Sequence, residues 1–194
     1  SLSTYKMAKG SALASIQISL VLLLAIVVCL EVNLLDPYCC YRGKETKITA
    51  YVQLFLGGPN VTTVPVAGAL GRPRIPEEFG TISVNDARLT EGISINSLTV
   101  GRSQGLYVSA SRDNLNSFDV FSFLFTNAQY NGSTLEFQGP GLDLQNVTTV
   151  REVSVVSGTK TFRYAQGYAA FATVLRRPAM NYTVIRGIVT IRHY

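Results

Sequence analysis

The stretch VGRSQGLYVSASRD, residues 100–113, decides how the rest of the chain is interpreted. It has the apolar content of a β-strand, yet glycine weakens a strand, and Gly101 and Gly105 lie four positions apart. Two polar residues between them, Arg102 and Gln104, share a parity and therefore face the same side of a sheet. Glycines in a strand suit a barrel strand that coils tightly or neighbours that approach closely. We predict that the two polar side chains form hydrogen bonds with neighbouring strands or subunits.

The segments on either side of this strand also show a period of two. In TKITAYVQLFL, residues 46–56, apolar side chains alternate so that Leu54 shares a face with Ile48 and Val52. NVTTVPVAGAL, residues 60–70, is extended, and its Pro65 indicates an edge strand or a bulge. The later segments alternate in the same way up to the closing stretch NYTVIRGIVTIRHY, residues 181–194. No stretch after residue 46 shows a helical period.

Turn signals divide these segments into strands. We place turns near Asn85-Asp86, near Glu91-Gly92 and around Ser157-Gly158. Asn131-Gly132, between two alternating segments, is the signal of a two-residue type I′ hairpin.

The fold class predicted from this pattern is all-β, with about eight strands in residues 46–194. An eight-stranded antiparallel β-barrel suits such a chain, because closure removes sheet edges and the interior can hold one small ligand. A β-sandwich is the alternative.

The first residues have the composition of a leader. Lys6 and Lys9 precede the apolar segment 14–30, which indicates a secretory signal peptide in residues 1–30, with an uncleaved anchor as the alternative. Met7 is a possible true start of the protein. Residues 31–45 form a linker, and we expect no stable membrane span in the mature form.

The glycosylation motifs agree with export, and the positions of the cysteines bear on the predicted barrel. All three cysteines precede residue 41, so the predicted barrel has no internal disulfide. Export would make the protein an extracellular glycoprotein. The candidate N-glycosylation sites are Asn60, Asn131, Asn146 and Asn181.

Composition argues against several classes of function. The net charge of +5 comes from scattered residues without a dense basic run, so nucleic acid is a poor candidate partner. A single histidine, His193, and a domain without cysteine predict no metal site. No phosphate-binding loop and no nucleophile-elbow motif is present, and the chain shows no sign of a cofactor of its own. We therefore expect the protein to act through a pocket.

Two long motifs are similar to those of a known family. VGRSQGLYV, residues 100–108, resembles the V-G-R-[AS]-Q-G segment of plant dirigent proteins. The resemblance continues through TNAQYNGSTLEFQG, residues 126–139, and VREVSVVSGTKTFRYAQGYAAFATV, residues 150–174, and it includes the closing stretch. It thus covers residues 46–194.

The resemblance implies an eight-stranded barrel related to that of allene oxide cyclase, exported to the apoplast as a homodimer or homotrimer. Its partners would be small phenolics, in the form of monolignol radicals made by an external oxidase such as laccase. Dirigent proteins orient these radicals and impart stereoselectivity on their coupling, as in lignan biosynthesis within phenylpropanoid metabolism. The expected protein has no oxidative activity of its own. Some relatives act instead on quinone methides as cyclising or dehydrating enzymes.

The resemblance also implies residues of the substrate pocket. Tyr107 matches a family tyrosine two residues after the last glycine of the motif, and Arg151 matches an arginine that precedes an acidic residue. Asp143 corresponds to a family aspartate only if the loop has one extra residue. Phe162 and Tyr168 are further candidates for the barrel lining.

Three departures from the family pattern concern the same pocket. Where the first strand of the family carries His-Asp, this chain has Gln53 and Leu54, so an interior carboxylate is missing. Ser109 stands where a second pocket tyrosine is expected, and Lys160 replaces a glycine. These departures predict a less polar pocket. They leave three functions open: orientation of phenoxy radicals, a non-catalytic cell-wall barrel that binds phenolics, and a quinone-methide cyclase or dehydratase.

Overall fold

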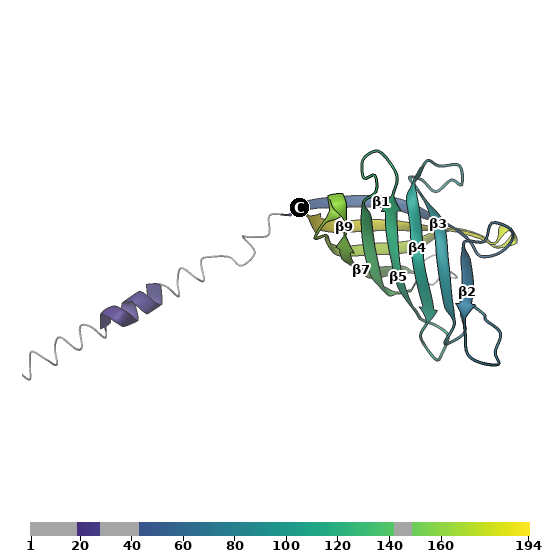
Figure 1. Cartoon of the computed structure of the whole chain (residues 1–194), viewed down its shortest axis with the longest axis horizontal. Helices are drawn as coiled ribbons and strands as arrows, with labels where there is room; N and C mark the ends of the chain where they lie inside the picture. The colour runs from purple at the N-terminus through teal and green to yellow at the C-terminus, as the bar shows by residue number, and fades with distance from the viewer. Residues whose placement is uncertain (1–18, 28–42, 142–148) are drawn as a thin grey trace, which may run out of the picture. The chain divides into compact units, whose positions relative to one another are not determined.

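The computed structural model describes residues 19–27, 43–141 and 149–194. Residues 19–27 are helical, and within the described ranges no helix is long and apolar enough to cross a membrane. Residues Gly43–Tyr194 form a separate unit built of strands (Figure 1). Asp143, Asn146 and the three cysteines lie outside the described residues.

The described residues of this unit form nine strands, with loops and two single 3₁₀ turns between them. The turns are η1, Lys160–Phe162, and η2, Pro178–Met180. The strands are β1 Lys44–Phe55, β2 Thr63–Ala67, β3 Ile82–Thr90, β4 Thr99–Ser109, β5 Ser117–Phe125, β6 Thr134–Pro140, β7 Val150–Gly158, β8 Gln166–Arg177 and β9 Tyr182–His193.

Eight of the strands close into an antiparallel barrel, which confirms the predicted fold. The order β1-β9-β8-β7-β6-β5-β4-β3 returns to β1 through a second pairing between β1 and β3. Strand β2 is the ninth and pairs only with β3, beyond the residues of β3 that contact β1. The register shifts between Pro65 and Ala67, so Pro65 lies on an edge strand beside a bulge, as predicted.

One predicted turn is absent, and another is present but is not of the predicted type. Asn85 and Asp86 lie inside the continuous strand β3, because pairing on both sides of the strand outweighs their turn preference. Asn131-Gly132 belongs to a longer connection between Phe125 and Thr134, in which only the glycine of that pair has a positive φ, of 71°. A type I′ turn needs a positive φ at both positions, so the two-residue hairpin does not form.

The glycines of β4 make room for phenylalanines on β5. Gly101 pairs with Phe125, Ser103 with Phe123, and Gly105 with Phe121. These phenylalanines join Phe137 and Phe171 in an aromatic cluster, and Phe121 stacks on Phe137 with ring centroids 4.9 Å apart. Small residues on one strand and large ones on the next fill the narrow interior of a barrel. The close approach predicted for these glycines is confirmed.

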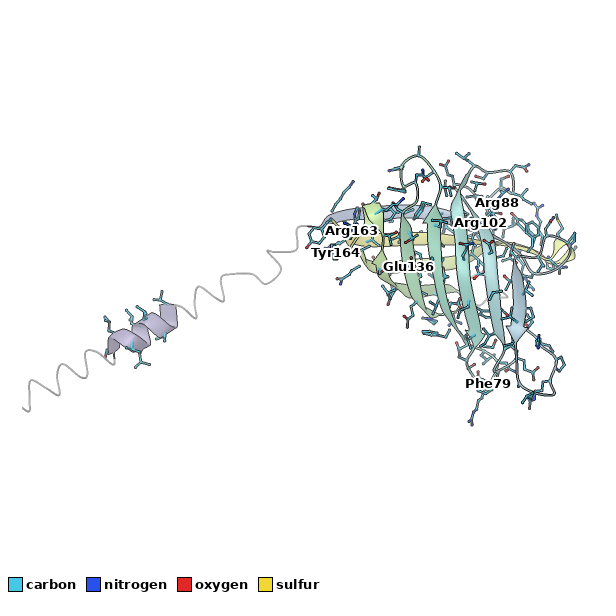
Figure 2. All side chains as sticks on the ribbon, in the orientation of Figure 1. Phe79, Arg88, Arg102, Glu136, Arg163 and Tyr164 are labelled. Carbon is cyan, nitrogen blue, oxygen red and sulfur yellow. The ribbon has the colours of Figure 1, made fainter. Side chains whose placement is uncertain are left out.

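Arg102 and Gln104 face the outside of the barrel. Arg102 Nε donates to Asp86 Oδ1 at 2.7 Å, and a second guanidinium nitrogen lies 2.6 Å from Asp86 Oδ2, on the neighbouring strand β3. The hydrogen bond from Arg102 holds the pKa of Asp86 below its ordinary value. Arg88, opposite Arg102 in the register, projects from the same surface (Figure 2). The predicted hydrogen bond between strands is confirmed for Arg102.

Candidate functional site

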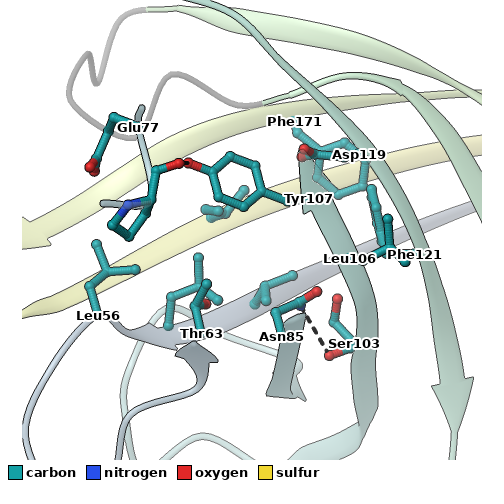
Figure 3. A pocket seen from close by; sticks show the side chains of 14 residues that line it. Leu56, Thr63, Glu77, Asn85, Ser103, Leu106, Tyr107, Asp119, Phe121 and Phe171 are labelled. Atoms are coloured by element: carbon teal, nitrogen blue, oxygen red, sulfur yellow. Dashed lines mark hydrogen bonds between the residues drawn. The ribbon is translucent and has the colours of Figure 1, made fainter. Parts of the chain in front are cut away.

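A cavity of about 300 Å³ opens into the barrel where β2 flanks β3. Its volume is at the lower end of the range for small-molecule sites, and its walls are mainly apolar. Seven strands and the loop before β3 contribute to it (Figure 3). The lining residues are Val52, Leu54, Leu56, Thr63, Pro76, Glu77, Asn85, Ser103, Leu106, Tyr107, Asp119, Phe121, Phe171 and Ile185.

The phenol of Tyr107 lies in this cavity and is bonded to the loop before β3. Its hydroxyl donates to the Pro76 carbonyl oxygen at 2.6 Å, and the Ser109 hydroxyl donates to the same oxygen. Burial raises the pKa of Tyr107, and the negative charges of Glu77 and Asp119 raise it further. Tyr107 is therefore a neutral phenol at physiological pH. Ser109 does not line the cavity but helps to hold its loop in place.

The two residues at the family's His-Asp position point to opposite sides of β1. Leu54 faces inward and lines the cavity, as the alternation of the strand predicts. Gln53 faces outward but is only 2% exposed, and its amide nitrogen donates to Thr90 Oγ1 at 2.7 Å. The Tyr182 hydroxyl donates to the Gln53 side-chain oxygen. At these two positions the cavity wall is therefore apolar, and the polar group serves a buried network on the outer side.

The other predicted pocket residues do not line this cavity. Arg151 donates to Asn116 Oδ1 at 3.4 Å, on the loop between β4 and β5. Phe162 is fully buried and packs against Phe125, with ring centroids 5.5 Å apart. Tyr168 lies on the outer face of β8 and is 48% exposed, because adjacent residues of a strand face opposite sides and the next residue, Ala169, is buried inside. Tyr168 therefore does not line the barrel, contrary to the prediction.

Sequence reasoning missed two carboxylates in the cavity. Asp119 faces the same side of β5 as Phe121. The Ser117 hydroxyl donates to Asp119 Oδ1 at 3.4 Å. Glu77 comes from the loop before β3. In Figure 3 the Tyr107 ring is seen between these two side chains. An acidic residue in the alternating segment FDVFSF was the available signal for Asp119, whereas nothing in a proline-rich loop marks Glu77 as a pocket residue.

Comparison with known proteins identifies the family. The model of the family described as "Dirigent-like protein" matches residues 45–191. The chain belongs to the dirigent family. Dirigent protein 1 of Arabidopsis thaliana is 35% identical over 164 residues, which cover 84% of this chain and 88% of that protein.

Dirigent relatives with a stated product are also similar to this chain. Pterocarpan synthase 1 of Glycyrrhiza echinata is 34% identical over 126 residues, covering 65% of this chain and 66% of that protein. The solved structure of a pterocarpan synthase dirigent protein matches with a TM-score of 0.69 at 30% identity, covering 78% of this chain and 86% of that one. The relatives of this chain thus include both proteins named dirigent proteins and proteins named pterocarpan synthases.

Three of the four candidate glycosylation sites lie in the described part of this dirigent chain. Asn60 and Asn131 are exposed in loops, and Asn181 is exposed at the start of the last strand with a φ of 49°. All three side chains are therefore accessible to modification.

Proposed function

We propose that this protein is a secreted dirigent protein that orients phenoxy radicals made by an external oxidase of the laccase type. The observation that supports this role is the cavity of about 300 Å³, with aromatic and aliphatic walls and a neutral phenol at Tyr107. Coupling of two radicals needs little activation, so a pocket contributes by holding them in one orientation. The product would be an optically active dimer of the lignan type.

The first test is chiral chromatography of coniferyl alcohol coupling products, formed by laccase with and without the protein. We expect an enantiomeric excess with the native protein and an unchanged total yield. Thr63→Trp narrows the cavity at the half-buried Thr63 and should reduce that excess by at least about half, because orientation is all that the pocket supplies. Thr49→Trp, on the exposed outer side of β1, is the matched control and should retain it.

Racemic products with every monolignol and phenolic tried would contradict this proposal. If phenolics then bound saturably without any product bias, the protein would be a non-catalytic phenolic-binding barrel of the cell wall. That outcome is the second candidate.

A synthase is the third candidate, and the likeness to pterocarpan synthases favours it. Leu54, in place of an interior carboxylate, weighs against acid or base chemistry at that position. Turnover of a quinone methide in the absence of any oxidase would establish the enzyme.

Export to the apoplast is part of the same proposal. It is supported by the apolar leader and by the exposure of Asn60, Asn131 and Asn181. Expression in a plant secretory system, followed by mass spectrometry of the N-terminus and the glycans, tests it directly.

We also propose that the barrel assembles with copies of itself through the outer face of β2 to β5. A row of four apolar residues crosses these strands, and each residue pairs with the next one in the row. The row consists of Val64, Val84, Leu106 and Val120, which are each 41–44% exposed. The adjacent row adds Ile82, Val108, Phe118 and Pro140. A continuous apolar face of this kind marks an interaction surface, and a second copy offers the same chemistry.

Introducing a charge in this face should dissociate the oligomer. Val120→Glu places a carboxylate in the patch at a residue that does not line the cavity, where burial in an interface would leave it unpaired. We expect a monomer by light scattering after size-exclusion chromatography, whereas Val156→Glu, at an exposed site on β7, should leave the native mass unchanged. A native protein that is already monomeric at high micromolar concentration would contradict the proposal.

A further inference from the structure

We propose that the pocket prefers phenolics that carry a protonated amino group over phenolics that carry a carboxylate, and that Asp119 and Glu77 set this preference. The inference rests on the proposed function, because it assumes that the cavity holds phenolic ligands. It adds the charge of the ligand, which membership of the family does not determine.

The first observation is the sign of the charge inside the cavity. The chain as a whole carries a net charge of +5, yet among the described residues the cavity lining has two carboxylates and no lysine, arginine or histidine. Both carboxylates are close enough to Tyr107 to raise its pKa. The pocket is thus a local region of negative charge in a basic protein, and walls of low polarity strengthen its effect on a bound ion.

The second observation is that two donors of the polar wall are already used within the protein, whereas its two carboxylates can only accept. The Tyr107 hydroxyl uses its hydrogen on the Pro76 carbonyl, and the Asn85 amide donates to the Ser103 carbonyl at 3.4 Å. Ionised carboxylates accept hydrogen bonds and donate none. A ligand that brings donors, such as a hydroxyl or an ammonium group, is therefore better matched than one that brings a second carboxylate.

The third observation concerns the aromatic wall beside Asp119. Phe121 and Phe171 line the cavity and meet edge to face, with ring centroids 5.5 Å apart. The apolar wall suits the ring of a phenol, and the negative face of an aromatic ring attracts a cation. A phenol with a short ammonium side chain combines both requirements within one ligand.

Two buried hydroxyl groups lie behind the cavity wall, on strands whose neighbours line the cavity. Ser83 and Thr173 are at most 2% exposed, and their hydroxyl oxygens make no hydrogen bond with any described residue. Ser83 pairs with Tyr107 in the register, and Thr173 pairs with Ile185. Both partners line the cavity.

Arg151, which the family resemblance implies for the substrate pocket, is not part of the cavity lining. Its guanidinium contacts Asn116 instead. The preference for positive charge is therefore not offset by an arginine within the cavity wall.

Three phenols of nearly equal size test the proposal: tyramine, tyrosol and 4-hydroxyphenylacetate, which are cationic, neutral and anionic at pH 7. Isothermal titration calorimetry with the secreted protein should give about tenfold tighter binding of tyramine than of 4-hydroxyphenylacetate, a difference of about 1.4 kcal/mol. Tyrosol should fall between them. Non-specific attraction to a protein of pI 9.2 predicts the reverse order, which makes the result diagnostic.

Two variants assign the effect to the cavity. Asp119→Asn keeps the shape of the side chain, and Glu77→Gln lies on an exposed loop where loss of fold is not a concern. Each should reduce the ratio of tyramine to 4-hydroxyphenylacetate affinity by at least threefold while changing tyrosol affinity less than twofold. Glu91→Gln, an exposed carboxylate that does not line the cavity, is the matched control and should leave the ratio unchanged.

The outcomes separate this inference from the proposed function. Equal affinities for the three phenols, or a ratio that both variants leave unchanged, would overturn the charge preference while tyrosol binding still supported a phenolic pocket. Failure of all three to bind would instead count against the pocket on which the proposed function rests, and the inference would fall with it.

Discussion

Replacing Gly105 or Gly101 with alanine is expected to lower the free energy of unfolding by about 3 kcal/mol or more. A Cβ at Gly105 would lie 2.3 Å from the carbonyl oxygen of Val120 and 2.5 Å from the Cα of Phe121. At Gly101 it would lie 2.1 Å from the carbonyl oxygen of Leu124. Because these neighbours are backbone atoms of β5, the two strands must separate to admit the methyl group. Urea denaturation followed by circular dichroism measures the loss.

Gly68→Ala is the control for this pair of variants. The nearest neighbour of its Cβ would be Arg74 Cγ at 3.2 Å, on a flexible exposed side chain, and the φ of Gly68 is not positive. We expect a change within about 1 kcal/mol, of either sign, because alanine also restricts the unfolded chain. If Gly105→Ala were as mild as Gly68→Ala, the close packing of β4 against β5 would be refuted.

Replacing Gln53 with leucine is expected to cost about 2–3 kcal/mol of unfolding free energy, although it adds apolar surface to a buried site. The change removes the acceptor of the Tyr182 hydroxyl and the donor to Thr90 Oγ1. Tyr182 is 3% exposed, so its hydroxyl cannot turn to water without disturbing the packing of its ring on Phe55, at a centroid distance of 5.0 Å. The melting temperature and urea midpoint report the loss.

A double-mutant cycle with Tyr182→Phe distinguishes the hydrogen bond from a packing effect. If the two side chains depend on each other, the double variant should cost less than the sum of the single variants. Gln166→Leu, at an exposed position on β8, is the control and should change stability by at most about 0.5 kcal/mol. Strict additivity in the cycle would show that the two groups do not interact.

Much of the barrel follows from alternation in the sequence, because a period of two determines which side chains face inward. It predicts that Leu54 faces the interior, and that Gly101 and Arg102 face opposite sides of β4. The structure shows both. Alternation does not reveal register, so the pairing of Gly105 with Phe121 became visible only in three dimensions. The same limit applies to Asp86, whose partner Arg102 lies on another strand.

The cavity was harder to predict than the barrel. The family resemblance indicates Tyr107 and the alternation of β1 indicates Leu54, whereas Asp119 and Glu77 belong to none of the family motifs quoted from the sequence. Gln53 could not be assigned to a buried network from the sequence, because loops cover the outer side of β1 at that point and local patterns do not show what a loop covers. The prediction that Tyr168 lines the barrel is wrong. Its position next to the buried Ala169 on β8 already indicates that it faces outward.

The way in which β1 joins the barrel has a consequence for the order of folding. Along β3 to β9 every strand pairs with the next in the chain, so these contacts are local and can form as hairpins. Strand β1 instead pairs over twelve positions with β9, from Lys44 opposite His193 to Phe55 opposite Tyr182, and over only three with β3. During synthesis, the first strand of the barrel must therefore wait for the last one to leave the ribosome. Until then its apolar face is exposed, and such a surface makes a nascent chain prone to aggregation.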